Sequence, residues 1–289
     1  MKLLVKFNIV LVLLFALGLL ATAQLTRSVL QENAKREVVN HASLMMEASL
    51  AAREYTTNEV KPLLAKAMLS TFLPQSVPSY AATQSFNKLH DNHPDYSYKE
   101  ATLNPTNPRD RVVDWEADVV QQFRTHPELK EMTGERMSTA GPSLYLARPI
   151  KIVDARCLAC HSTAAAAPET MKALYGSSNG YGWKLGETIG SQIVSVPLAL
   201  AQREADRVFQ LIMVGMLATF GAMLLALNLL FHLLVLRPMN KISRIADAVS
   251  AGQLDVPHFD VGGRDEMAVL SAAFNRMRRS LEKAMTLLA

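Results

Sequence analysis

The chain has 289 residues, a mild formal net charge of +4 and only two cysteines. Its basic residues are scattered and interleaved with acids, whereas a nucleic-acid-binding protein shows a clustered basic face, so nucleic acid is excluded as an expected partner. The length would allow one sizeable core or two small ones, but two long apolar stretches leave room for one globular domain between them.

The first apolar stretch is predicted to be a transmembrane helix over residues 7–25, after a short basic tail at residues 1–6. Its length is near the lower limit for a spanning helix. The same segment fits a secretory signal peptide, with Ala21-Thr22-Ala23 as a small-residue cleavage site. We favour an uncleaved anchor because the residues that follow continue a helical pattern. Either interpretation exports the next segment.

The second apolar stretch, residues 208–236, is predicted to span the membrane. It is longer than a core helix requires, and its strongly polar interruptions are limited to Gln210, Asn228 and His232. Basic residues precede the first span and follow the second, which places both ends in the cytoplasm by the positive-inside rule. The predicted location is the bacterial inner membrane, with residues 26–207 in the periplasm.

The exported region is predicted to have an α+β fold. Residues 26–67 read as a long helix, and the steps between Leu44, Ala48, Ala51 and Tyr55 predict its packed face. Prolines over residues 73–108 indicate turns, and residues 115–123 form a short amphipathic helix. Residues 142–152 and 192–197 read as strands. Helices followed by strands around a loop that carries ligands indicate an α+β domain.

One short motif points to a cofactor. Cys157-Leu158-Ala159-Cys160-His161 has the C-x-x-C-H spacing of covalent haem c attachment. Two thiols three residues apart can each add to one porphyrin vinyl group, and the next residue, His161, supplies the proximal axial imidazole. A redox dithiol would need a βαβ setting, structural zinc would need further ligands at set spacing, and a disulfide would close a very small loop.

The distal side of the iron cannot be assigned from the sequence. Histidine and methionine are the ordinary ligands, and the leading candidates are His41, Met45, Met46 and His93. The residues His90, Met132 and Met137 qualify on the same chemistry. A five-coordinate iron, open to a gas, is the alternative.

The tail, residues 237–289, is predicted to form two short helices. Pro238 opens a helix whose stripe is Ile242, Ile245, Ala246 and Val249, and Gly252 ends it. A connector follows, and Asp265-Glu266 opens a second helix. Its heptad seam is Met267, Leu270, Phe274, Met277, Leu281, Ala284 and Leu288. Two such helices cannot bury their stripes alone, but a homodimer can bury them in a four-helix bundle, so a homodimer is expected. This tail, which directly follows a predicted membrane span, resembles a HAMP domain.

The exported region also resembles a known family over residues 26–207. The matching segments, in order, are Ala52-Arg53-Glu54-Tyr55-Thr56, Phe72-Leu73-Pro74-Gln75-Ser76-Val77-Pro78, Tyr96-Ser97-Tyr98-Lys99-Glu100, Asn104-Pro105-Thr106-Asn107-Pro108, Gly141-Pro142-Ser143-Leu144-Tyr145 and Gly182-Trp183-Lys184. Together they are similar to the c-type-haem PAS-like sensor family. The resemblance implies a PAS-like antiparallel sheet with flanking helices, thioether roles for Cys157 and Cys160 and a proximal role for His161. It implies no distal ligand.

Two functions fit these features. The first is a receptor that senses redox state or a diatomic gas at the haem and signals through HAMP to a separate output protein, such as a kinase. The second is a membrane-anchored c-type cytochrome for electron transfer, with the tail as a dimerising anchor. We favour the receptor because of the HAMP resemblance, and we expect no enzymatic activity.

Overall fold

The computed structural model describes residues 3–138, 141–253, 256–259 and 265–288, with side chains from Leu4 to Lys283. The chain divides into two compact units, Gln24–Phe209 and Met1–Ala23 together with Gln210–Ala289. The first unit contains the sheet and the cysteine motif, and the second contains the apolar parts of two long helices and the tail.

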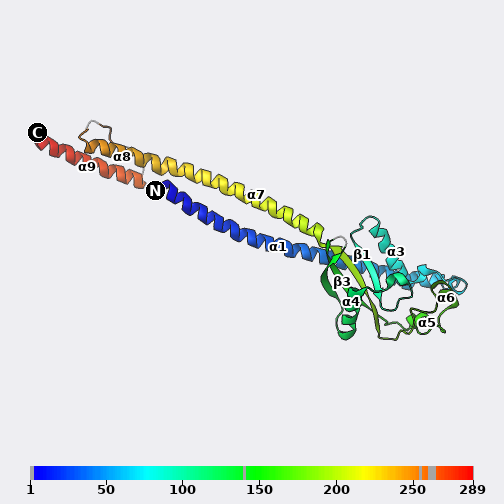
Figure 1. Cartoon of the computed structure of the whole chain (residues 1–289). Coiled ribbons are helices and arrows are strands. Elements are labelled where there is room, and N and C mark those ends of the chain that lie inside the picture. The colour runs from blue at the N-terminus through cyan, green and yellow to red at the C-terminus, as the bar shows by residue number, and fades with distance from the viewer. Residues whose placement is uncertain (1–2, 139–140, 254–255, 260–264, 289) are drawn as a thin grey trace. The chain divides into compact units, whose positions relative to one another are not determined.

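The first unit is built on a four-stranded antiparallel sheet (Figure 1). Its strands are β1 (Ser97–Thr102), β2 (Met132–Ser138), β3 (Gly141–Lys151) and β4 (Thr188–Pro197). They lie in the order β1-β4-β3-β2, so β3 and β4 form the centre. The 36 residues between them, 152–187, form a long connection at one end of the sheet.

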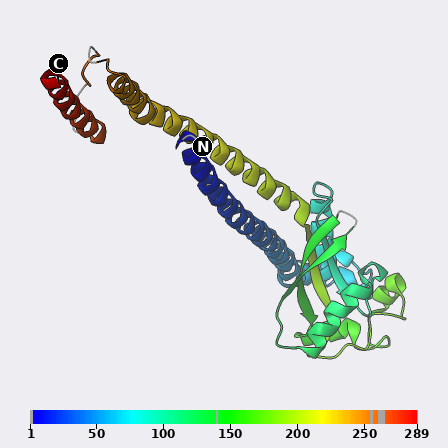
Figure 2. The same ribbon diagram turned by 60° about the vertical axis from the view of Figure 1, so that its left-hand side comes forward.

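Helices pack on both faces of this sheet (Figure 2). The outer part of α1 (Leu3–Tyr55) and α3 (Pro78–His90) cover one face, where Leu146 and Val194 are fully buried. Helix α4 (Asp114–Thr125) covers the other face through Val119 and Phe123. Alternation along each strand sends successive side chains to the two cores. The predicted α+β fold class is confirmed.

Short helical segments complete this unit. After α1 the chain continues as a π-helical turn, η1 (Thr56–Val60), and α2 (Lys61–Leu64). The connection between β3 and β4 holds α5 (Leu158–His161) and α6 (Glu169–Tyr175). Single 3₁₀ turns are η2 (Ala67–Leu69), η3 (Pro74–Ser76), η4 (Pro108–Asp110) and η5 (Ala155–Cys157).

Some predicted elements are confirmed and others were missed. The strands expected at residues 142–152 and 192–197 are β3 and the end of β4, and the short helix at 115–123 is α4. The proline-rich stretch also contains α3, because Pro78 stands at its first turn, where proline needs no amide partner. Strands β1 and β2 were missed because polar side chains occupy most of their positions.

The predicted packed face of the long helix was wrong. Leu44 is 70% exposed and Tyr55 is 63% exposed, whereas Ala42 and Met46 are fully buried. The buried stripe is therefore rotated away from the one predicted. Alanines occur on both faces of this helix, so apolar spacing alone does not tell which face packs.

In the second unit, the inner part of α1 and α7 (Leu198–Phe231) are long and apolar enough to cross a membrane, and the most apolar part of each is unburied. Phe7 stacks on Phe231 with ring centroids 4.8 Å apart. The Asn8 and Asn228 side-chain amides each donate to the other's oxygen at 2.7 Å. This pair satisfies two polar groups that would be costly to leave alone in lipid.

Beyond α7 the helix continues through a π-helical turn, η6 (His232–Leu236), into α8 (Arg237–Ser250), and α9 (Glu266–Leu288) follows the connector. Ile242 and Val249 of the predicted stripe are buried. On α9 the Asn275 amide accepts from the backbone amide of Phe259 at 3.0 Å and donates to its carbonyl at 2.9 Å. The side chains of Ala284 and Leu288, and connector residues 260–264, lie outside the described part.

Candidate functional site

The C-x-x-C-H motif lies in the long connection between β3 and β4. Backbone hydrogen bonds of Ile152 with Gly186 (2.7 Å) and Glu187 (2.9 Å) close the base of this connection. The Asp154 carboxylate then accepts from the backbone amide of Arg156 at 2.8 Å, which caps the turn η5. One turn of helix, α5, follows immediately and holds the motif in a fixed conformation at the end of the sheet.

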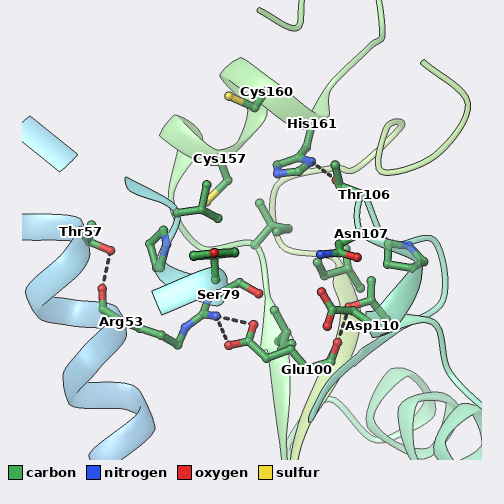
Figure 3. A pocket seen from close by; sticks show the side chains of 18 of the residues that line it. Arg53, Thr57, Ser79, Glu100, Thr106, Asn107, Asp110, Cys157, Cys160 and His161 are labelled. Atoms are coloured by element: carbon green, nitrogen blue, oxygen red, sulfur yellow. Dashed lines mark hydrogen bonds and ion pairs between the residues drawn. The ribbon is translucent and has the colours of Figure 1, made fainter. Parts of the chain in front are cut away.

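A cavity of about 570 Å³ adjoins the motif (Figure 3). This volume lies in the range of roughly 300–1,000 Å³ that is usual for cofactor sites. Its wall includes all three motif residues, and the end of α1 and η1 contribute another part of it. Apolar and aromatic side chains dominate one part of the lining: Leu50, Met68, Phe72, Val77, Tyr80, Ile152, Met171 and Tyr175.

His161 is held by three neighbours. Its Nδ1 lies 2.7 Å from the Gly180 carbonyl oxygen, and its ring stacks on Trp183 with centroids 3.9 Å apart. The Thr106 hydroxyl lies 3.4 Å from the same nitrogen. A carbonyl can only accept, so this contact assigns the proton to Nδ1 and leaves a lone pair on Nε2. Burial lowers the pKa of His161, against the opposing effect of the Gly180 hydrogen bond.

This arrangement suits an axial ligand. A histidine that binds a metal usually donates its other N–H to a carbonyl or carboxylate, which fixes the tautomer and the ring orientation. Gly180 meets that need with a backbone carbonyl, at a φ of +84° that favours glycine. The sequence did not single out Gly180 for this contact.

The two cysteines are free thiols, each partly buried. Burial raises the pKa of the Cys160 thiol, and the nearby Lys61 ammonium acts in the opposite direction. Both thiols line the same cavity as His161. Two unpaired thiols and one imidazole on a single wall are the donor set that covalent haem attachment requires.

A buried ionic group forms another part of the wall (Figure 3). Arg53, at the end of α1, reaches across to β1 and donates to both carboxylate oxygens of Glu100, one at 2.6 Å. The Tyr98 hydroxyl also donates to Glu100, at 2.8 Å, and the Gln192 amide of β4 donates to that hydroxyl at 3.4 Å. Burial acts to lower the pKa of Arg53, but the Glu100 carboxylate outweighs it and raises that pKa.

Sequence reasoning did not assign these residues to the site, although Arg53 and Glu100 lie within two of the segments quoted for the family resemblance. Glu100 was the feature of the sequence that could have indicated this ionic group. It shares its side of β1 with Tyr98, and an ionisable side chain on the inner face of a strand needs a partner.

The distal-ligand candidates lie elsewhere. His41 and His93 are exposed, Met46 is fully buried in the core, and Met45 packs against that core. These four are absent from the lining of the cavity, as are His90, Met132 and Met137. Core packing explains Met45 and Met46, because the face of α1 that carries them covers the sheet. The lining contains Met68 and Met171 instead.

Comparison with known proteins now identifies the domain. A family model described as "Tll0287-like: Tll0287" matches residues 31–197. The chain belongs to the Tll0287-like family. A second model, described as "HAMP domain", matches residues 230–283. The Tll0287-like domain thus contains the cavity and the motif, and a HAMP domain follows the second apolar helix.

One solved structure is similar to this chain, "Crystal structure of the cyanobacterial heme-protein Tll0287". It is 16% identical, covers 56% of this chain and 95% of its own, and has a TM-score of 0.42. Among curated proteins there is no match. A Tll0287-like domain joined to HAMP and to two apolar helices indicates a signal-transducing membrane receptor.

Proposed function

We propose that this protein is an inner-membrane receptor that holds a covalent haem c in its periplasmic Tll0287-like domain. The observation that carries the proposal is the placement of Cys157, Cys160 and His161 on one wall of a cavity of cofactor size. The two thiols would form thioethers, and His161 would supply the proximal ligand. The haem would supply a redox-active iron that can also bind diatomic gases.

The residues around His161 support this role. The Gly180 carbonyl accepts the Nδ1 proton and keeps Nε2 available. Trp183 covers one face of the imidazole and limits its rotation. Loss of the hydrogen bond between His161 and the Gly180 carbonyl should therefore weaken the axial bond to iron before it affects haem attachment.

The signal would leave the domain along the two long helices. The end of α1 forms part of the cavity wall, and β4 passes directly into α7 at Leu198. Helix α7 leads through η6 into the HAMP helix α8. A change of redox state or gas ligation shifts this system only if it stabilises one arrangement of these helices over another.

A homodimer is expected at the HAMP domain. Within one chain, α9 turns Ser271, Asn275 and Arg278 inward. Three apolar seam residues, Leu270, Met277 and Leu281, remain 39%, 49% and 44% exposed. A second copy of α8 and α9 would cover this seam in a four-helix bundle. The output would then pass to a separate cytoplasmic protein, such as a kinase.

The first test is the haem itself. The full chain, made in cells competent for cytochrome c maturation, should gain the mass of one haem and show a c-type absorption spectrum. Cys157→Ala should leave one thioether. His161→Ala should alter the spectrum of the ferric and ferrous forms. His93→Ala is the matched control, because this histidine is exposed and outside the cavity. A chain without added haem mass would refute the proposal.

Orientation and signalling need their own tests. Reporter fusions at residues 100 and 289 should report periplasm and cytoplasm, respectively. Deletion of residues 238–288 should abolish the cellular response while the haem spectrum persists. The alternative is a membrane-anchored cytochrome that delivers electrons to a soluble acceptor. If the protein does so, and if this activity persists after the deletion, the receptor proposal is wrong.

A further inference from the structure

The Arg53 side chain uses only part of its hydrogen-bonding capacity. A guanidinium has five N–H donors. Within the described part of the chain, all side-chain hydrogen bonds of Arg53 come from Nη1, and Glu100 accepts them. The N–H groups of Nε and Nη2 are therefore left over.

These remaining donors are open to the cavity. Among the described residues, no fully buried side-chain nitrogen or oxygen lacks a hydrogen-bond partner. The Nε and Nη2 atoms of Arg53 must therefore retain some accessible surface, and Arg53 lines the cavity (Figure 3). Its side chain is only 26% exposed, so an acceptor placed there would be largely shielded from water.

The charge of the cavity favours an anion at this position. Five cationic side chains and four carboxylates line it, which gives a formal charge of +1 with His161 neutral. Thr57, one turn after Arg53 on the same wall, has its hydroxyl bonded to the Arg53 carbonyl at 2.9 Å, so it competes little for the guanidinium. A charge-assisted bond from arginine to an anionic acceptor is about twice as strong as a neutral one.

We propose that Arg53 is an anion-binding residue of the haem cavity, which divides its donors between Glu100 and an anionic oxygen or nitrogen of the bound group. This inference rests on the proposed haem function. The acceptor can come from either of two sources, a carboxylate of the porphyrin or a small inorganic anion that enters beside the iron. Both present the same chemistry to the guanidinium.

The contact between Arg53 and Glu100 also connects the cavity to β4. Glu100 is 4% exposed and also binds Tyr98, which the Gln192 amide of β4 contacts. An anion that binds the remaining donors would shift the guanidinium against Glu100, next to the strand that leads into α7. Anion occupancy and the position of β4 would thus be coupled.

The test uses the haem-loaded full chain in detergent, with azide as the small-anion probe. Arg53→Gln should weaken azide binding to the ferric protein by about tenfold or more if the acceptor is a small anion. If the acceptor is a porphyrin carboxylate, azide affinity should hold and the propionate bending band in the resonance Raman spectrum should shift. Lys151→Gln removes one positive charge from the same cavity at an exposed position and is the matched control.

A second variant, with the opposite expected effect on azide binding, distinguishes a specific effect from a loss of folding. Glu100→Gln keeps Arg53 and removes one negative charge from the cavity, so it should tighten azide binding or shift the propionate band in the other direction. If Arg53 only stabilises the fold, both variants should bind azide more weakly or not at all. If haem-loaded Arg53→Gln and Glu100→Gln match the Lys151→Gln control in azide affinity and Raman spectrum, the inference is overturned. Absence of haem mass would instead overturn the proposed function.

Discussion

The ion pair between Arg53 and Glu100 should show strong, non-additive coupling in stability. Glu100 is 4% exposed and Arg53 26% exposed, so removal of one partner leaves the other charge poorly solvated. Breaking a buried pair by removing one partner costs about 3–5 kcal/mol. We expect Arg53→Met to reach that range, because Glu100 then keeps, among the described residues, only the Tyr98 hydroxyl at 2.8 Å.

The reverse substitution should cost less. In Glu100→Gln the guanidinium remains on the cavity wall, where water can reach its free donors, so we expect a loss of about 1–3 kcal/mol. The double variant Arg53→Met with Glu100→Gln leaves no unpaired charge. Its loss should therefore fall short of the sum of the single losses by about 1–3 kcal/mol, the usual coupling for residues in one network.

The cycle can be measured by urea unfolding of the full chain in detergent, followed by tryptophan fluorescence. Both tryptophans, Trp115 and Trp183, lie in the unit that contains the pair. The unfolding slope must be the same for all four proteins for the free energies to be comparable. Additive losses, within about 0.5 kcal/mol, would show that the two side chains do not depend on each other and would refute this reasoning.

Three further outcomes follow from single contacts. Gly180→Ala should destabilise the domain by more than 1 kcal/mol and reduce haem incorporation, because its φ is +84° and a new Cβ would lie 2.0 Å from the Thr106 hydroxyl; thermal unfolding and haem content test both effects. Asn8→Leu and Asn228→Leu should each lower the free energy of unfolding in detergent by about 0.6 kcal/mol, and at most by about 1.7 kcal/mol, which a lower melting temperature would report. Burial raises the pKa of Asp110, so its carboxyl group binds a proton more tightly in the folded state than in the unfolded state. The stability of the protein should therefore fall as pH rises from the ordinary pKa of an aspartate through the raised pKa of Asp110. Asp110→Asn should flatten that fall in a series of melting curves from pH 4 to pH 7.

Each of these has a control. Gly182 has a φ of +83°, and no atom of the described residues lies within 4 Å of a new Cβ, so Gly182→Ala carries the backbone strain without the steric contact. Equal losses in the two glycine variants would contradict the role given to Thr106. The double asparagine variant should lose no more than one single variant, and a loss twice as large would contradict the reciprocal pair. An unchanged pH series in Asp110→Asn would contradict the raised pKa.

Local and periodic features were readable in the sequence by itself. The C-x-x-C-H spacing, the two apolar stretches and the two tail helices with Gly252 between them all depend on neighbours within a few turns of chain. Family models match residues 31–197 and 230–283, which confirms the two resemblances that these local features gave. Strand β3 and the end of β4 were also predicted, since the apolar residues of these segments alternate as they do in a strand.

Only the tertiary structure decided what faces the motif. Arg53, Thr106 and Gly180 come from three separate segments, and their contacts with Glu100 and His161 span 47, 55 and 19 residues. The sequence alone does not tell which of several identical side chains lines the cavity. Met45 and Met46 of α1 pack in the core, whereas Met68 and Met171 line the cavity. The packed face of α1 was likewise set by the sheet it covers, because alanine spacing fits either face and only the burial of Val38 and Met46 against β3 and β4 selects one.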